Sequence, residues 1–273
     1  VTAAAEQATA CAAAADCDPL PAIRALAAMR AFALAAQVLD RGPLARPASA
    51  SHELLKLRFG LASALGDAAG ELATARRIQA LRPDAPEAAD LLAAGLARNG
   101  EWRKAIEILH DLSKRHPERD IVLGRIAGMI NFLTDAAGAD PARKADLDAI
   151  EARMQLAAAD SSDIVARFIV ATRDYYAGRL DKALPQLQAL NQSANRDPRL
   201  PLYLAMTHYW LGHQQQAQRT IQRAVDIGPS DPDVFYCRSQ IARRVNLPLA
   251  IADLERYAAM TRDALDGARL VAI

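Results

Sequence analysis

A glycine recurs at a fixed step of 34 residues along this chain, and this repeat constrains the fold more than any other sequence feature. Gly66 precedes Gly100 by 34 residues, and Gly178 precedes Gly212 by the same step. After the glycines at 100, 178 and 212, an alanine follows five residues later and an apolar residue four residues after that alanine. A fixed period of this length is typical of proteins built from stacked copies of one small structural unit.

The pattern around each glycine predicts a pair of antiparallel helices. An apolar-periodic segment runs up to the glycine, which favours the left-handed backbone turn that ends a helix. The alanine, as in Ala105 or Ala217, lets the second helix approach the first closely. A proline twelve residues later, Pro117 or Pro229, ends the second helix. Each pair has apolar faces that it cannot bury alone, so the pairs must stack.

The pattern resembles the tetratricopeptide repeat family, whose repeats are 34 residues long. The resemblance covers about 50–260 and is clearest in the repeat that begins near Pro86. In that repeat, the residues at the family's motif positions are Leu92, Ala93, Gly100, Trp102, Ala105, Leu109 and Pro117. The repeat from 198 to 231 matches in the same way, whereas the repeat from 52 to 85 has Glu71 where the family has alanine.

The resemblance implies an all-α fold, a right-handed superhelix (solenoid) of about six helical hairpins with capping helices at both ends. We expect an Ala-rich segment and a capping helix over 1–47, one continuous solenoid over 48–273, and a short closing helix over 263–273. The expected hairpins span 52–85, 86–119, 120–163, 164–197, 198–231 and 232–262. Gly100 and Gly178 are 78 residues apart, ten more than two periods. We place this insertion at Asp135–Pro141, within 135–145, because helix-breaking residues cluster there.

Composition agrees with a folded helical protein and argues against several other classes. Hydrophobic residues make up 52% of the chain, too many for a disordered protein. The 33 basic and 32 acidic residues form no long run of one sign, so we expect no nucleic-acid partner. Charged residues interrupt every apolar stretch well before about 18 residues, so we expect no membrane-spanning helix.

No motif in the sequence points to a catalytic residue, a metal or a cofactor. The chain has no GxSxG, HExxH, phosphate-loop or GxGxxG sequence. His110 and His116 are six residues apart and His208 and His213 are five apart, neither of which places two ligands on one helix face. We therefore predict a non-enzymatic protein without a cofactor. The alternative is an enzyme or a cofactor- or metal-binding protein with its site in the inserted unit 120–163 or between the two histidine pairs.

The family resemblance implies that the first helix of each hairpin lines a concave groove. Carried onto the three C-terminal hairpins, the groove positions include four of the six tyrosines and one of the two tryptophans. Such side chains suit peptide recognition, and neighbouring arginines can bind a carboxylate. The alternative is that these residues are ordinary core between helices, Phe168 and Met206 above all. The predicted groove residues are Phe168, Thr172, Tyr175, Tyr176, Arg199, Met206, Tyr209, Trp210, Tyr236, Gln240, Arg243 and Arg244.

These features predict a scaffold or adaptor that holds a protein or peptide in the groove of its C-terminal half. We keep a self-assembling scaffold as an alternative, in which the groove accepts a second copy and the protein is a homo-oligomer.

Two cysteines near the N-terminus suggest a compartment. Cys11 and Cys17 form a disulfide if a helix ends between them, and Pro19 is placed to cause that end; the alternative is two separate thiols. The chain starts at Val1 and is rich in alanine there. We expect a bacterial extracytoplasmic protein, periplasmic or secreted, with a cytoplasmic location as the alternative. Similar proteins of that compartment serve envelope assembly, secretion or polymer export.

Overall fold

The structure is a computed structural model of the chain that describes residues 6, 10, 20–41, 51–116, 121–192 and 197–271. These residues form helices and the turns between them, with no β-strand, which confirms the predicted all-α fold. The predicted disulfide between Cys11 and Cys17, and the helix-ending Pro117, lie outside the described residues. None of the described helices has the length and apolar character needed to cross a bilayer.

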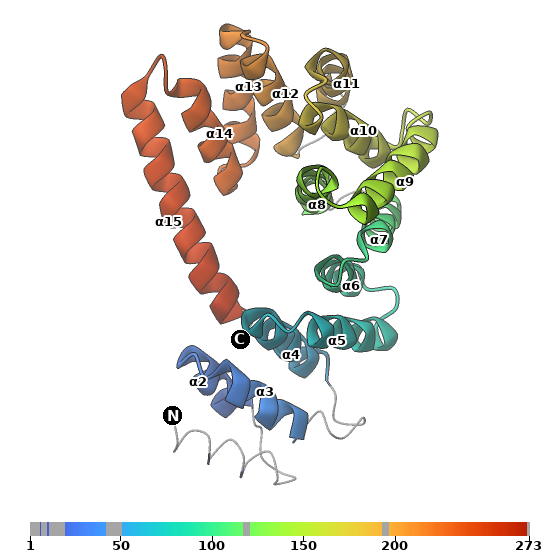
Figure 1. Cartoon of the computed structure of the whole chain (residues 1–273). Helices are drawn as coiled ribbons and strands as arrows, with labels where there is room; N and C mark the ends of the chain where they lie inside the picture. The colour runs from blue at the N-terminus through green and yellow to red at the C-terminus, as the bar shows by residue number, and fades with distance from the viewer. Residues whose placement is uncertain are drawn as a thin grey trace. The chain divides into compact units, whose positions relative to one another are not determined.

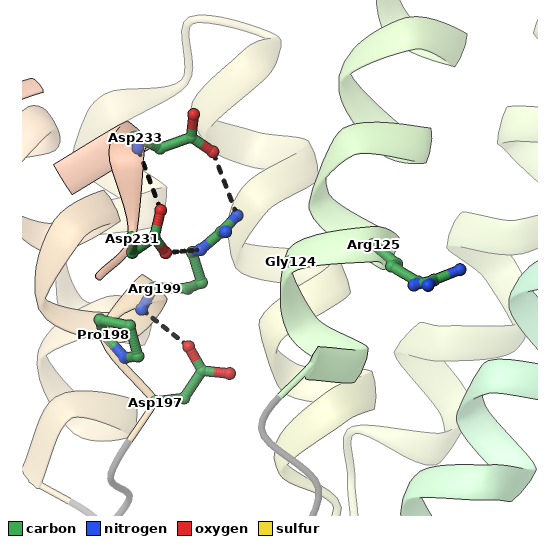
Figure 2. A pocket seen from close by; sticks show the side chains of 7 residues that line it. All are labelled: Gly124, Arg125, Asp197, Pro198, Arg199, Asp231 and Asp233. Atoms are coloured by element: carbon green, nitrogen blue, oxygen red, sulfur yellow. Dashed lines mark hydrogen bonds and ion pairs between the residues drawn. The ribbon is translucent and has the colours of Figure 1, made fainter. Parts of the chain in front are cut away.

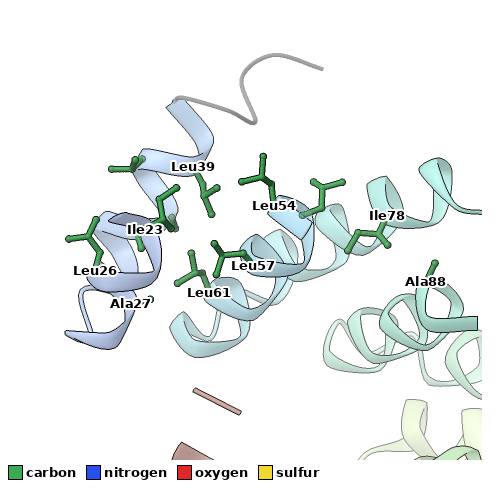
Figure 3. Packing of buried hydrophobic residues seen from close by; sticks show 13 residues of the cluster. Ile23, Leu26, Ala27, Leu39, Leu54, Leu57, Leu61, Ile78 and Ala88 are labelled. Carbon is green, nitrogen blue, oxygen red and sulfur yellow. The ribbon is translucent and has the colours of Figure 1, made fainter. Parts of the chain in front are cut away.

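Contacts divide the chain into two compact units, one of 1–101 with 263–273 and one of 102–262. The first unit includes α2 (Leu20–Ala28), α3 (Phe32–Arg41), α4 (His52–Leu65), α5 (Ala68–Leu81) and α6 (Pro86–Arg98), coloured blue to teal in Figure 1. Each of these helices packs against the next one. Their apolar faces form a core that contains Ile23, Leu26, Leu39, Leu57, Leu61, Ile78 and Ala88 (Figure 3).

The second unit is a longer series of the same hairpins. Its helices are α7 (Trp102–Arg115), α8 (Ile121–Ala137), α9 (Pro141–Ala157), α10 (Ile164–Tyr176), α11 (Leu180–Gln192), α12 (Arg199–Trp210), α13 (Gln214–Ile227), α14 (Pro232–Ala242) and the beginning of α15 (Leu247–Val271). Two helices lie in each of the first five ranges predicted as hairpins, and the sixth contains α14 and the beginning of α15. α2 and α3 lie in 1–47, where we predicted one capping helix. The predicted closing helix over 263–273 is not separate. α15 continues through it to Val271, and no proline follows Pro248 in this helix.

The four glycines of the 34-residue pattern make the turns that the sequence predicts. Gly66, Gly100, Gly178 and Gly212 have backbone φ angles of 69°, 80°, 72° and 79°. Residues with a Cβ atom rarely adopt this left-handed backbone conformation, so glycine at these positions lets the chain turn directly after the first helix. The periodic glycines therefore fix where these four hairpins turn.

The inserted residues of 120–163 lengthen two helices instead of forming a loop. α8 and α9 have 17 residues each, whereas α10 and α11 have 13 each. Asp135–Pro141, where we placed the insertion, is not a long loop: α8 extends to Ala137, and α9 begins at Pro141. Asp140 instead accepts hydrogen bonds from the first backbone N–H groups of α9, and Pro141 occupies its first turn. Both residues favour the beginning of a helix at these positions.

Candidate binding surface

The first helices of successive hairpins form one layer in the second unit. α8 packs against α10, α10 against α12, and α12 against α14. α9, α11 and α13 lie on the other side of this layer (Figure 1). Residues separated by about one repeat in the sequence therefore become neighbours on the first helices, as the groove prediction requires.

Trp210 is a large aromatic side chain held in place at the surface of this layer. It ends α12 and is 60% exposed. Its indole Nε1 donates a hydrogen bond to the hydroxyl of Tyr175 on α10 over 3.1 Å. The ring of Tyr209 contacts the indole ring at a centroid distance of 5.1 Å and an interplanar angle of 63°. An exposed indole that is fixed in this way loses little side-chain freedom when a partner covers it.

Tyr175 belongs to a cluster of three tyrosines between α10 and α12. The hydroxyl groups of Tyr176 and Tyr203 lie 2.5 Å apart. The Tyr175 ring lies 5.2 Å from the ring of Tyr176 and 5.4 Å from that of Tyr203, both edge to face. Edge-to-face contacts of this kind stabilise aromatic clusters beyond the burial of apolar area. The cluster therefore fixes the Tyr175 hydroxyl to which Trp210 donates.

The three tyrosine hydroxyls stay protonated at neutral pH. Burial raises the pKa of Tyr175, although the hydrogen bond from Trp210 works in the opposite direction. Burial also raises the pKa of Tyr176 and raises that of Tyr203 well above its usual range. These groups therefore act as neutral hydrogen-bonding groups and not as bases.

A pocket of about 450 Å³, lined mostly by charged residues, lies at the beginnings of α8, α12 and α14. Arg199 is its central residue, with Nε 2.8 Å from Asp231 and Nη1 3.4 Å from Asp233 (Figure 2). Burial alone would lower the pKa of Arg199, but Asp231 and Asp233 outweigh it and raise the pKa. The remaining lining residues are Gly124, Arg125, Asp197 and Pro198.

Gly124 lets the Arg199 guanidinium lie against the backbone of α8. A Cβ atom at this position would be 2.9 Å from the Arg199 Cζ atom. Arg125 lines the same pocket but points away from Arg199 (Figure 2). At the other side of Arg199, the side chain of Asp197 accepts a hydrogen bond from the Arg199 backbone N–H over 2.8 Å. The guanidinium therefore has a defined position between α8 and α14.

Comparison with known families agrees with this geometry. Residues 175–241, which contain Tyr175, Arg199, Trp210 and Asp233, match a family model described as tetratricopeptide repeat. This segment is therefore similar to tetratricopeptide repeats.

Solved structures similar to this chain include tetratricopeptide repeat proteins. One from Parabacteroides merdae is 15% identical, has a TM-score of 0.49, and the match covers 99% of this chain and 98% of that chain. A thermophilic tetratricopeptide repeat protein from Thermus thermophilus is 19% identical, with a TM-score of 0.41 and coverages of 81% and 96%. MamA from Desulfovibrio magneticus is 13% identical, with a TM-score of 0.36 and coverages of 78% and 97%. A search of curated proteins finds no match.

Three of the predicted groove residues lie in the core of the repeats and not at a surface. Phe168 and Thr172 have no exposed area, and Met206 is 7% exposed. The Phe168 and Tyr203 rings meet edge to face with their centroids 5.6 Å apart, and Thr172 donates its hydroxyl hydrogen to the Phe168 carbonyl. The first helices pack so closely that these positions are filled by neighbouring helices. The prediction that these three residues line an open groove is therefore corrected.

The remaining predicted residues lie at or near the surface of the repeats. Tyr236 on α14 is 45% exposed, and its ring lies 5.3 Å from that of Tyr257 on α15. Arg243 and Arg244 are exposed at the end of α14, and Gln240 is half-buried. The structure thus brings Tyr175, Tyr176, Arg199, Tyr209 and Trp210 to neighbouring helices, with Tyr236 to Arg244 on the next one.

The sequence prediction missed Tyr203 and Asp231 as members of the site. The repeat register does not place Tyr203 at a groove position, so it was not among the predicted residues. Asp231 accepts a hydrogen bond from the Asp233 backbone N–H and caps α14. The Asp-Pro-Asp sequence at a helix start was the available signal for this cap. Nearby Cys237 stays a thiol, because burial first and then Asp233 and Asp231 raise its pKa to about 12.

His110 and His208, one from each histidine pair of the sequence, have different environments. His110 Nε2 lies 2.8 Å from Asp163 in a buried pair, and Lys114 lies 3.1 Å from the same carboxylate. Burial alone would raise the pKa of Asp163, but hydrogen bonds from the Ala166 N–H, His110 and Lys114 lower it. His208 and His213 have Nδ1 atoms 3.2 Å apart. Across the residues that the structure describes, no group of three or more His, Cys, Asp or Glu is placed to hold a metal ion.

We expect the stability of the protein to decrease below about pH 6.5 because of His208. Burial, and then the charge of His213, lower the pKa of His208 in the folded state. The unfolded chain therefore binds a proton at a higher pH than the folded chain does. The free energy of unfolding should decrease as the pH falls through 6.5 toward the folded pKa. Urea unfolding at pH 7.5 and 5.5 measures this change, which should be smaller in His208→Gln; an equal change in both proteins would contradict it.

Proposed function

We propose that this protein is a non-enzymatic scaffold that binds a segment of another protein along α10, α12 and α14. Tetratricopeptide repeat arrays generally serve as scaffolds for protein interactions. The observation that carries the proposal here is the exposed Trp210 side chain, fixed by its hydrogen bond to Tyr175. Tryptophan and tyrosine dominate binding energy at protein interfaces, and a side chain that is already ordered contributes more of its contact energy to affinity.

The surface has an aromatic end and a polar end, which limits the partner that it fits. Trp210 ends α12, and Arg199 begins it. Eleven helical steps separate them, which correspond to about 16 Å along the helix axis. An extended segment of about five residues spans that distance. We therefore expect a partner segment with a large apolar residue at Trp210 and a polar residue at the Arg199 pocket.

The cellular setting is part of the same proposal. We propose that the protein acts outside the cytoplasm of a bacterium, in envelope assembly, secretion or polymer export. The spacing of Cys11 and Cys17 favours an oxidising compartment, and the family resemblance supports an assembly role.

A peptide selection tests the binding proposal without knowledge of the natural partner. Peptides selected on the folded protein from a random phage-displayed library are synthesised, and their affinities are measured by isothermal titration calorimetry. We expect Trp210→Ala to weaken binding of these peptides at least about tenfold, because it removes the central apolar contact.

The matched control is Leu156→Ala. Leu156 is 81% exposed on α9, on the other side of the first-helix layer. Both substitutions remove an exposed apolar side chain, so a general loss of surface hydrophobicity would affect both. The control should bind the peptides with unchanged affinity. Equal affinities for Trp210→Ala and the unsubstituted protein would contradict the proposal.

A further inference from the structure

α15 carries an apolar face that no other described part of the second unit covers. Leu247, Ile251 and Leu254 are 58%, 50% and 41% exposed. Their spacing of four and then three residues places them on one side of the helix, and the exposed Ala258 continues the row. We call these four residues the α15 seam.

The seam is distinct from the side of α15 that packs on α14. On that side, Asp253 forms two hydrogen bonds with Arg238, at 2.7 and 2.8 Å. The guanidinium of Arg256 lies 4.1 Å from the centre of the Phe235 ring. Two of the charged residues of this helix stretch are therefore directed toward α14, which leaves the seam apolar.

The repeat register identifies the kind of element that covers this face in other hairpins. The alanines at the small-residue position of four second helices are Ala105, Ala183, Ala217 and Ala250, and all are 2% exposed or less. Four residues after the first three stand Leu109, Leu187 and Ile221, which are also at most 2% exposed. The next first helix packs against each of these second helices: α8 on α7, α12 on α11, and α14 on α13. Leu254 occupies the same register position in α15 but remains 41% exposed, so its position is one that an apolar helix normally covers.

The helices of this chain point to α15 itself as the covering helix. Each other described helix that exposes a large apolar side chain exposes only one, whereas α15 exposes three on one face. The spacing 247, 251, 254 and 258 is also the alternating four-and-three spacing at which two helices pack side by side in a coiled coil. A face that pairs with itself about a two-fold axis gives the commonest form of homodimer.

We propose that the protein dimerises by packing the α15 seam against the α15 seam of a second copy. This contact uses the last hairpin and leaves the surface of Trp210 on α12 available for a partner segment. The interface contains few large side chains, so we expect weak association with a dissociation constant on the order of 100 µM.

Sedimentation velocity over a concentration series tests the dimer. The full chain should sediment as one chain at low concentration and shift toward two chains as the concentration approaches about 500 µM. Leu254→Glu places a charge in the centre of the seam and should weaken dimerisation at least about tenfold. Ile251→Lys is a second variant, so that a folding defect in one protein does not decide the result. Circular dichroism should show unchanged helicity in both, because both side chains are substantially exposed.

Leu156→Glu is the control, since it adds the same charge at an exposed apolar site on α9 and should leave the dimer intact. A full chain that stays a single chain at every concentration would overturn the proposal. So would a dimer that both seam variants leave unchanged, which would indicate another interface. Peptide affinity at Trp210 is measured separately, so a failed dimer and a failed binding surface give different results.

Discussion

Replacing Phe168 with alanine should lower the free energy of unfolding by about 3–5 kcal/mol. The side chain is fully buried between the first helices and contacts the edge of the Tyr203 ring. Its removal loses the free energy of burying a large apolar group. It also leaves a cavity, because the neighbouring helices pack against further repeats and can fill the space only in part. Urea unfolding followed by circular dichroism at 222 nm measures the change.

The control for this prediction is the same substitution at an exposed phenylalanine. Phe132 on α8 is 50% exposed and stacks on Trp102 at a centroid distance of 4.7 Å. Phe132→Ala should cost only about 1 kcal/mol, since much of its ring already contacts water. Equal losses for the two variants would mean that Phe168 is not in the core. That result would restore Phe168 to the set of surface residues that the repeat register predicts.

Replacing Asp253 with alanine should destabilise the last hairpin by about 3 kcal/mol or more. The Asp253 side chain is 3% exposed, and both of its oxygens accept hydrogen bonds from the guanidinium of Arg238. These hydrogen bonds raise the pKa of Arg238, although burial works in the opposite direction. Without Asp253, a largely buried positive charge loses its partner. Chemical unfolding measures the loss, and hydrogen exchange of α14 and α15 locates it.

Asp148→Ala provides the contrast, because it removes an ion pair at the surface. Asp148 lies 2.7 Å from Lys144 one turn earlier on α9, and their side chains are 52% and 64% exposed. Such pairs contribute no more than about 0.5 kcal/mol. A similarly small effect of Asp253→Ala would show that the contact between α14 and α15 does not depend on its buried ion pair.

The repeat geometry could be predicted from the sequence because it depends on local chemistry. Gly178 and Gly212 adopt positive φ angles at the predicted turns. The alanines at the small-residue position of the second helices, such as Ala183 and Ala217, are buried where two helices approach each other. These residues act within one hairpin, so a 34-residue window contains all the information. The inserted unit departed from this pattern because Asp140 and Pro141 favour the start of a helix as well as the end of one.

The site was only partly predictable because helical register gives the direction of a side chain and not its depth. Phe168 and Trp210 were both predicted to line the groove, yet Phe168 is fully buried and Trp210 is 60% exposed. Depth depends on how far the neighbouring helix extends over each position. An offset of one residue turns a side chain by about 100°, which explains why Tyr203 was missed. The Arg199 pocket requires contact between α8 and α12, which no single repeat specifies.

The fluorescence of Trp210 tests the central claim most directly, since the chain has only two tryptophans. In a Trp102→Phe variant, Trp210 becomes the single tryptophan reporter. Titration with the selected peptides, synthesised without tryptophan, should shift its emission to shorter wavelength as the peptide excludes water from the indole. The shift should saturate at the dissociation constant obtained by calorimetry. Peptides that bind by calorimetry while the Trp210 emission stays unchanged would contradict the claim that this aromatic surface is the binding site.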